Sequence, residues 1–241
     1  MKKTCHAFTL AEVLVTVGIL GVVASLTMPT LITNYQKQTN VTLLRKTAND
    51  FANATDLYIT EEGKTNFVNT GAMADDDSIK KFMRSKFKVR ETNGFVSSYT
   101  SISGRTNSYT CSGTGYVLPS SAAVCITKKM TALHTPVLHV QIDVNGTKKP
   151  NIGGRDMFDF YIDRDGSIIP DLESYNFVNN HKGEAFKDNI TNIKDESAKD
   201  VACKTNIVTG ETSGYCKKCI DSPLGKDCYE MLESNNWKMT Y

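Results

Sequence analysis

Residues 8–32 read FTLAEVLVTVGILGVVASLTMPTLI and contain a single ionisable side chain, that of Glu12. The last twenty of these residues, 13–32, carry no charge at all. At about 1.5 Å rise per residue they would form a helix of roughly 30 Å, which matches the hydrocarbon core of a bilayer. Lys2 and Lys3 precede the stretch. Their basic charge predicts a cytoplasmic N-terminus, with everything after residue 32 on the other side.

Three interpretations of this stretch differ in how they account for Glu12. A cleaved secretory signal would end at a small-residue cleavage motif, whereas this apolar run continues past Pro29 without an A-x-A stop. A plain signal anchor fits the length, but it gives no role to a carboxylate whose insertion into a membrane helix costs about 2.5–3.5 kcal/mol. Glu12 is therefore a candidate functional residue.

The third interpretation rests on a pattern: a short basic leader, the residues FTLAE at 8–12, and an apolar run that contains a proline. This pattern resembles the N-terminus of type IV prepilins and type II secretion pseudopilins over about 25 residues. The resemblance implies that a prepilin peptidase cleaves between Ala7 and Phe8 and that Phe8 is then N-methylated. Ala7 stands where the family usually has glycine.

The resemblance also implies a role and a set of partners. The chain would be a structural subunit of a type IV pilus or a type II secretion pseudopilus, first held in the bacterial inner membrane as a single-pass protein with its C-terminal domain periplasmic or extracellular. Its partners would be other pilin or pseudopilin subunits, the prepilin peptidase, the inner-membrane assembly platform and, before assembly, membrane lipid. Within a bundle of apolar helices, Glu12 would pair with the α-amino group of a neighbouring subunit's Phe8, because an unpaired carboxylate there is costly. Pro29 and Glu12 are the residues expected to act in assembly.

Two alternatives belong to other functional classes. In the first, the chain is a minor pilin that acts as an adhesin or a ligand-binding tip subunit, with residues 93–115 or 205–226 as its contact surface. In the second, it is a membrane-anchored enzyme. No G-x-S-x-G, H-E-x-x-H or P-loop pattern is present, and His139 lies in an expected strand. We therefore expect no catalytic residues.

Beyond residue 32 the helix is expected to continue as an amphipathic one. Apolar residues recur at spacings of three and four as far as Leu57, and Gly63 is a suitable C-terminal stop. A second helix is expected from Asp75 or Asp77 to about Phe87, with the acidic cluster 75–77 as a solvated helix start rather than a metal site.

Strands are expected at 116–118, 123–127, 137–144 and 157–163, with turns at Asn145-Gly146 and Asp165-Gly166 that favour an antiparallel meander. Residues 90–115 are rich in Ser, Thr, Asn and Gly, and they read as a surface loop. A helix followed by a block of strands predicts an α+β, pilin-like fold. The expected organisation is a leader at 1–7, a transmembrane or filament-core helix at 8–32, its amphipathic continuation at 33–63 and a globular domain at 64–241.

The segment 140–170 carries five side chains with oxygen ligands near turns, the ligand type that calcium requires. Ordinary turn formation is the favoured interpretation, and the spacing is not that of an EF-hand. Calcium is the alternative, and we expect no other cofactor. The candidate calcium ligands are Asp143, Asn145, Asp156, Asp163 and Asp165.

Seven cysteines are an odd number for an exported chain, and cleavage after Ala7 would remove Cys5. The remaining six lie on the expected outer side of the membrane, where disulfides persist, and six cysteines allow fifteen pairings. The preferred pairing joins Cys111 to Cys125, while four others would staple the C-terminal region. The expected disulfide cysteines are Cys111, Cys125, Cys203, Cys216, Cys219 and Cys228.

The overall charge sets one further limit. The chain has 28 Lys and Arg against 26 Asp and Glu, a formal net charge of +2. Nucleic-acid binding driven by overall charge is therefore excluded, and the basic residues of the tail are too few and too mixed with acids to indicate such a partner.

Overall fold

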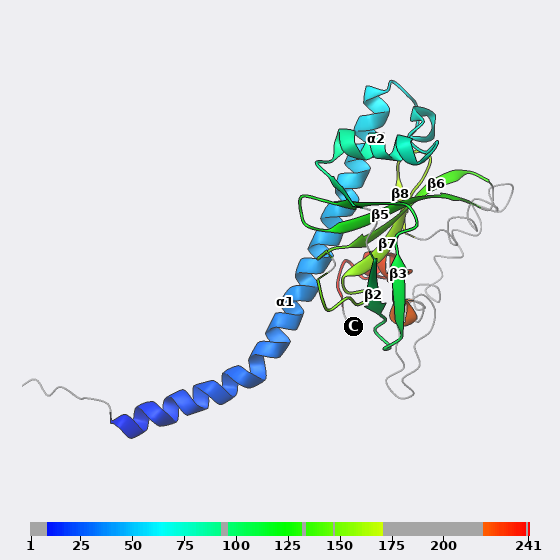
Figure 1. Ribbon diagram of the computed structural model, residues 1–241. Coiled ribbons are helices and arrows are strands. Elements are labelled where there is room, and N and C mark those ends of the chain that lie inside the picture. The colour runs from blue at the N-terminus through cyan, green and yellow to red at the C-terminus, as the bar shows by residue number, and fades with distance from the viewer. Residues whose placement is uncertain (1–8, 93–95, 132–133, 147, 171–218, 240) are drawn as a thin grey trace, which may run out of the picture. The chain divides into compact units, whose positions relative to one another are not determined.

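The computed structural model describes residues 9–92, 96–131, 134–146, 148–170, 219–239 and 241. The chain divides into two compact units, Met1–Thr39 and Asn40–Tyr241. Figure 1 shows the elements in chain order. The helices are α1 (Leu10–Glu61), the short 3₁₀ helix η1 (Val68–Thr70), α2 (Asp76–Lys86) and α7 (Cys228–Ser234). The strands are β1 (Arg90–Thr92), β2 (Val96–Thr100), β3 (Thr106–Thr110), β4 (Thr114–Val117), β5 (Ala123–Met130), β6 (Pro136–Asp143), β7 (Met157–Ile162) and β8 (Ile168–Ile169).

The long N-terminal helix is confirmed. α1 runs without a break for 52 residues, close to the expected 8–62. It ends where the sequence predicted, because Gly63 adopts a left-handed conformation with φ +61°. The amide of Lys64 then donates to the carbonyl oxygen of Ile59 at 3.0 Å, which satisfies an acceptor of the last turn.

The part of α1 inside the second unit packs on the inner face of the sheet. Its buried residues recur at helical spacing, and Phe51 is fully buried among them. The Phe51 ring centroid lies 5.9 Å from that of Phe160 on β7 and 4.8 Å from that of Phe87 after α2. This core therefore joins α1, the sheet and the segment after α2. The buried residues of α1 are Val41, Leu44, Thr47, Ala48, Phe51, Ala54, Thr55 and Tyr58.

α2 forms for the reason expected from its sequence. The Asp75 carboxylate accepts a hydrogen bond from the amide of Ser78 at 2.8 Å, which caps the helix start. This bond lowers the pKa of Asp75. Ile79, Phe82 and Met83 form the buried face. The acidic cluster is thus a capped and exposed helix start.

The main sheet is antiparallel throughout and has the order β1-β4-β5-β6-β7-β8. From β4 to β8 it is the expected meander (Figure 1). Alternation along β6 puts Leu138, Val140 and Ile142 in the core cluster that includes α1. His139 and Gln141 face the other side of the sheet, where the Nε2 atom of His139 lies 3.0 Å from Asp159 Oδ2.

The expectation of a loop at 90–115 was wrong. β1 pairs with β4 at the edge of the main sheet, and β2 pairs with β3 in a separate two-stranded sheet. Tyr99 and Tyr109 explain the second sheet, because both rings are buried with their centroids 6.1 Å apart. The tyrosines and several β-branched threonines favour strands, although the many Ser, Asn and Gly residues of this segment are typical of a loop.

Two disulfides are present among the described residues. One joins Cys111 to Cys125, the pairing preferred from the sequence, and so attaches the end of the β2–β3 hairpin to β5. The other joins Cys219 to Cys228 at the start of α7. Cys203 and Cys216 lie outside the described residues.

The C-terminal segment is held by aromatic contacts and one hydrogen bond. The Trp237 ring meets the Tyr229 ring edge-on at 5.3 Å between centroids, and the guanidinium of Arg45 on α1 lies 5.7 Å from the Trp237 centroid. The hydroxyl of Tyr241 donates to the carbonyl oxygen of Gly154 at 2.8 Å. Trp237 therefore packs within the second unit.

Candidate functional site: the N-terminal assembly helix

The start of α1 is organised by Thr9 and Glu12. The amide and the hydroxyl of Thr9 both donate to Oε2 of Glu12, at 2.8 and 2.7 Å. In return, the amide of Glu12 donates to the Thr9 hydroxyl at 3.3 Å. This reciprocal pattern is a capping box, which satisfies backbone donors that a helix start otherwise leaves unpaired. Glu12 thus has a structural role within its own chain.

Thr9 was not among the residues selected from the sequence. The signal was available, because a threonine followed three residues later by glutamate, just before an apolar run, is the signature of a capping box. The Thr9–Glu12 spacing thus gives the carboxylate a local role at the helix start.

Between residues 10 and 32 the surface of α1 is apolar on every side. Thirteen large apolar side chains between residues 10 and 32 are each more than half exposed, from 51% for Val13 to 79% for Leu10. Because they occupy consecutive turns in all directions, they form no single stripe. A helix that is apolar all round requires an apolar environment on all sides. Within the described residues, α1 is the helix that is long and apolar enough to cross a membrane.

The hydroxyl groups of this half of the helix are satisfied within the helix itself. Thr16 donates to the carbonyl oxygen of Val13 at 3.0 Å, and Ser25 donates to that of Val22 at 2.8 Å. Each such bond turns a polar side chain back onto the backbone, so it needs no water or partner. These hydroxyl groups can therefore enter hydrocarbon already hydrogen-bonded.

Pro29 lies inside α1 rather than at its end. Proline has no amide donor, so the helix loses one backbone hydrogen bond at this point. The hydroxyl of Thr33, one turn later, donates to the carbonyl oxygen of Pro29 at 2.9 Å. Ala7 and Phe8, the residues expected at the processing site, lie outside the described residues.

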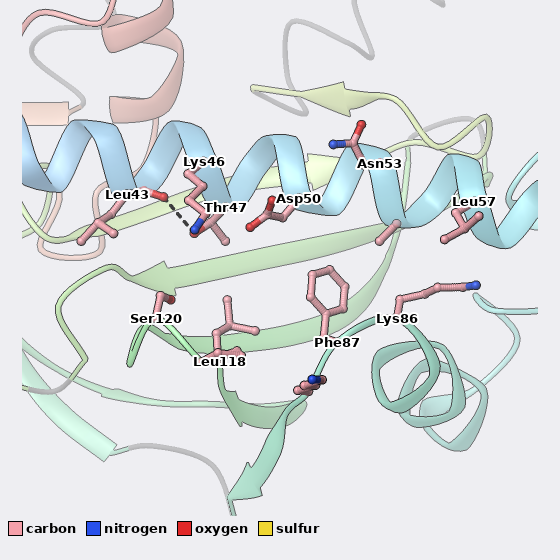
Figure 2. Close-up of a pocket in the computed structure, with 13 residues that line it drawn as sticks. Leu43, Lys46, Thr47, Asp50, Asn53, Leu57, Lys86, Phe87, Leu118 and Ser120 are labelled. Atoms are coloured by element: carbon pink, nitrogen blue, oxygen red, sulfur yellow. Dashed lines mark hydrogen bonds between the residues drawn. The ribbon is translucent and has the colours of Figure 1, made fainter.

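A cavity of about 430 Å³ lies in the second unit, between α1 and the segments that follow α2 and β4. Figure 2 shows the Phe87 ring pointing from the segment after α2 toward α1, with Leu118 beside it. The charged groups that line the cavity are Asp50 and three lysines, one of which, Lys86, pairs with Glu61. The described residues around this cavity include no histidine or cysteine.

The candidate calcium ligands fall into two groups. Asp143, Asn145 and Asp156 come together where the β6–β7 connection begins and ends. Asp163 and Asp165 lie instead in the β7–β8 turn, where the amide of Arg164 donates to Asp163 Oδ1 at 2.7 Å. The described residues contain no group of three or more His, Cys, Asp or Glu side chains that could hold a metal ion.

The two aspartates of the first group have unusual electrostatics. Burial is the main cause that raises the pKa of Asp143 to about 7, and repulsion from Asp156 adds to it, against the hydrogen bond from Tyr99. Burial likewise raises the pKa of Asp156 to about 6. Ordinary aspartates titrate near pH ~3.9.

Comparison with known proteins places the N-terminal features in one motif. The prokaryotic N-terminal methylation motif matches residues 2–28, which include Ala7, Phe8 and Glu12. Searches of curated proteins and of solved structures found no match to the chain. The motif indicates prepilin-type processing and supports a type IV pilin-like subunit, a class of protein that is generally structural. The chain thus combines a prepilin N-terminal methylation motif with a pilin-like α+β architecture, consistent with the type IV pilin and pseudopilin family.

Proposed function

We propose that this chain is a structural subunit of a type IV pilus or a type II secretion pseudopilus. The observation that carries the proposal is the all-round apolar surface of residues 10–32, joined in one continuous helix to a folded domain. In lipid that surface is covered by acyl chains, and in a filament it would be covered by the same helix of neighbouring subunits. Packing between helices then replaces packing with lipid, since both environments are equally apolar.

Processing precedes assembly. A prepilin peptidase would cleave between Ala7 and Phe8, and methylation would follow on the new α-amino group. Before cleavage the subunit would sit in the bacterial inner membrane with its N-terminus in the cytoplasm and residues 64–241 on the outer side. The assembly platform and other pilin or pseudopilin subunits would then take it into the filament.

Glu12 would serve in two contacts. Inside its own chain it completes the capping box with Thr9 through Oε2. Its negative charge would also attract the α-amino group of Phe8 of a neighbouring subunit, because an apolar bundle strengthens the attraction between opposite charges. The pairing would set the axial register between subunits.

Three variants separate the two contacts. Glu12→Gln keeps an amide oxygen that can accept from Thr9, but it has no charge. Thr9→Val keeps the charge and removes the hydroxyl. Glu12→Ala removes both. We expect filaments to be lost in Glu12→Gln and Glu12→Ala and to be retained at reduced yield in Thr9→Val.

The measurement is filament yield by electron microscopy, with mass spectrometry of the N-terminal peptide as a control. The peptide of wild type and of each variant should begin at residue 8 and carry one methyl group. Filaments of Glu12→Gln at the wild-type level, from correctly processed subunits, would show that charge pairing has no role. An unprocessed wild-type chain would contradict the proposed function as a whole.

A further inference from the structure

The cavity between α1 and the segments after α2 and β4 is a groove with an exposed face of α1 as one wall. Lys46, Asp50 and Leu57 recur at spacings of four and seven residues, so they lie on one face of the helix. Figure 2 shows Phe87 and Leu118 pointing toward α1 from the opposite wall. Leu57 is 52% exposed, so part of the apolar lining of the groove is open to water.

The charged rim of the groove is mainly basic. Lys46 and Lys88 are exposed, and they line the groove from α1 and from the segment after α2. Neither lysine forms an ion pair with a carboxylate of the described chain, whereas Lys86 pairs with Glu61. Asp50 is the carboxylate among the described lining residues, and it offsets only part of this charge. The rim therefore keeps a positive charge that fits an acidic partner.

The chain presents an acidic segment at the other end of α2. Asp75, Asp76 and Asp77 begin this helix, and all three are exposed. Asp77 pairs with Lys80 at 2.9 Å, whereas Asp76 forms no ion pair with a described residue. Because α2 has 11 residues, about 15 Å of helix separate this segment from Lys88. The acidic segment and Lys88 therefore do not meet within one chain.

We propose that the groove receives the acidic start of α2 from a second copy of the chain. The inference rests on the proposed function, in which copies associate. Complementary surfaces at different places on one chain form a heterologous contact, which repeats from copy to copy and builds an open helical filament. Asp76 of one copy lies beside Lys46 and Lys88 of the next, and the contact removes the apolar walls of the groove from water. Exclusion of water strengthens the attraction between the opposite charges.

The dipole of α2 offers a simpler explanation for part of this charge pattern. Acidic residues at the start of a helix and basic residues at its end are favourable without any partner. That explanation covers Asp76 and Lys88, but it does not cover Lys46, which lies on α1, or the apolar groove between them. It also predicts that reversing these charges changes the stability of the domain and leaves association unchanged.

Charge reversal tests the contact in filaments of the full-length chain. The groove variant carries Lys46→Glu and Lys88→Glu, and the α2 variant carries Asp76→Lys and Asp77→Lys. Each variant alone brings like charges together at the contact between copies. We therefore expect the filament yield, counted by electron microscopy, to fall at least about tenfold in each. Yields at the wild-type level in both variants would overturn the proposal.

Two controls separate a lost contact from a lost fold or a general effect of charge. Lys64→Glu with Lys129→Glu makes the same change in net charge as the groove variant, at exposed lysines outside the groove, and it should keep the wild-type filament yield. The Tm of every variant, measured in detergent, should stay within about 4 °C of that of the wild type, because all the changed side chains are exposed. An equal loss of filaments in the control would assign the effect to net charge and overturn the contact.

Coexpression of the groove variant and the α2 variant tests whether the contact joins two copies. The groove variant has two acidic surfaces and the α2 variant has two basic ones, so neither packs on its own kind but each can receive the other. We expect mixed filaments that contain both variants, at a yield at least about tenfold above that of either alone. Loss of filaments in both variants without recovery on coexpression would mean that the groove receives something other than α2 of a second copy.

Cysteine pairing tests the geometry of the contact directly. Lys88→Cys with Asp76→Cys places one thiol on each surface, and a mild oxidant applied to intact cells should give a ladder of covalent multimers on a non-reducing gel. Lys129→Cys with Asp76→Cys is the matched control and should give no ladder. Filaments of the first variant without a ladder would overturn this contact and leave the proposed function standing, whereas a wild-type chain that forms no filaments would contradict both.

Discussion

The two halves of α1 belong to one continuous helix, but their apolar side chains are exposed in the first half and largely buried in the second. In residues 10–32 the large apolar side chains are more than half exposed on every side. From Val41 to Tyr58 the apolar side chains form one stripe that the sheet and α2 bury. The second half has its partner in its own chain, whereas the first half must find one in lipid or in other chains. The same secondary structure thus serves folding in one half and, under the proposed function, association in the other.

The largest expected effect comes from truncating a matched side chain in each half. Phe51→Ala removes a fully buried ring from the packed half and should lower the free energy of unfolding by about 3–5 kcal/mol. Leu20→Ala changes a side chain that is 67% exposed, and it should leave the unfolding of the second unit unchanged. Urea denaturation of the mature chain in detergent, followed by Trp237 fluorescence, measures both. A similar decrease in the free energy of unfolding in Leu20→Ala would show that the first half of α1 also contributes to folding of the domain.

The next effect concerns the disulfide that attaches the β2–β3 hairpin to β5. Replacing both Cys111 and Cys125 by serine opens a loop with a sequence separation of 14 residues. The chain-entropy treatment of such a loop gives a loss of about 3 kcal/mol. Thermal unfolding followed by near-ultraviolet circular dichroism should show it as a lower Tm, by roughly 2–4 °C per kcal/mol for a domain of this size.

Filament formation by the serine variant sharpens the comparison. Because the proposed assembly depends on the first half of α1, variant subunits that remain folded at the assay temperature should still form filaments. Folded variant subunits that fail to assemble would show that the β2–β3 hairpin also takes part in association. The first half of α1 would then not be sufficient for filament formation.

A smaller effect is the pH dependence of the packed unit. Burial raises the pKa of Asp143 to about 7 in the folded chain, above about 3.9 in the unfolded chain. The folded state therefore binds a proton more tightly, so this contribution to stability is complete below pH ~4 and is lost as the pH rises through 7. The free energy of unfolding should fall by about 1–2 kcal/mol between pH 6 and pH 8.

Asp143→Asn is the test of that assignment. An asparagine can still accept from Tyr99 but does not titrate, so the slope between pH 6 and pH 8 should become shallower. An unchanged slope would assign the pH dependence to another group.

The elements that could be predicted from the sequence are those with strong local signals. α1 has a long apolar run followed by a regular stripe, and α2 has a capping aspartate and one apolar face. The meander followed from alternating apolar strands and turn dipeptides. β2 and β3 were missed because their stability comes from contacts distant in sequence, where Tyr99 donates to Asp143 and Tyr109 donates to Gln141.

The candidate sites show the same division between local and distant signals. Glu12 is distinguished in the sequence as a lone carboxylate, whereas its role as the acceptor of Thr9 depends on where the helix begins. Five oxygen-bearing residues were candidates for calcium, and only the path of the chain separates Asp143, Asn145 and Asp156 from the two in the β7–β8 turn. That path could not be predicted because it depends on Gly146 and on the packing of the β6–β7 connection.

The smallest expected effect compares the caps of the two helices. Asp75→Ala removes the side chain that accepts from the Ser78 amide, and it should cost about 1 kcal/mol in the unfolding of the second unit. Asp76→Ala, in the same exposed cluster but inside the helix, should change stability by less than about 0.5 kcal/mol. Thr9→Ala removes a cap of similar chemistry from α1, yet it should leave domain unfolding unchanged, because Thr9 and its partner Glu12 are both exposed. Denaturation curves of the three variants at one protein concentration measure these changes in the free energy of unfolding. If Thr9→Ala lowered it as much as Asp75→Ala does, the whole of α1 would unfold as one cooperative unit with the domain.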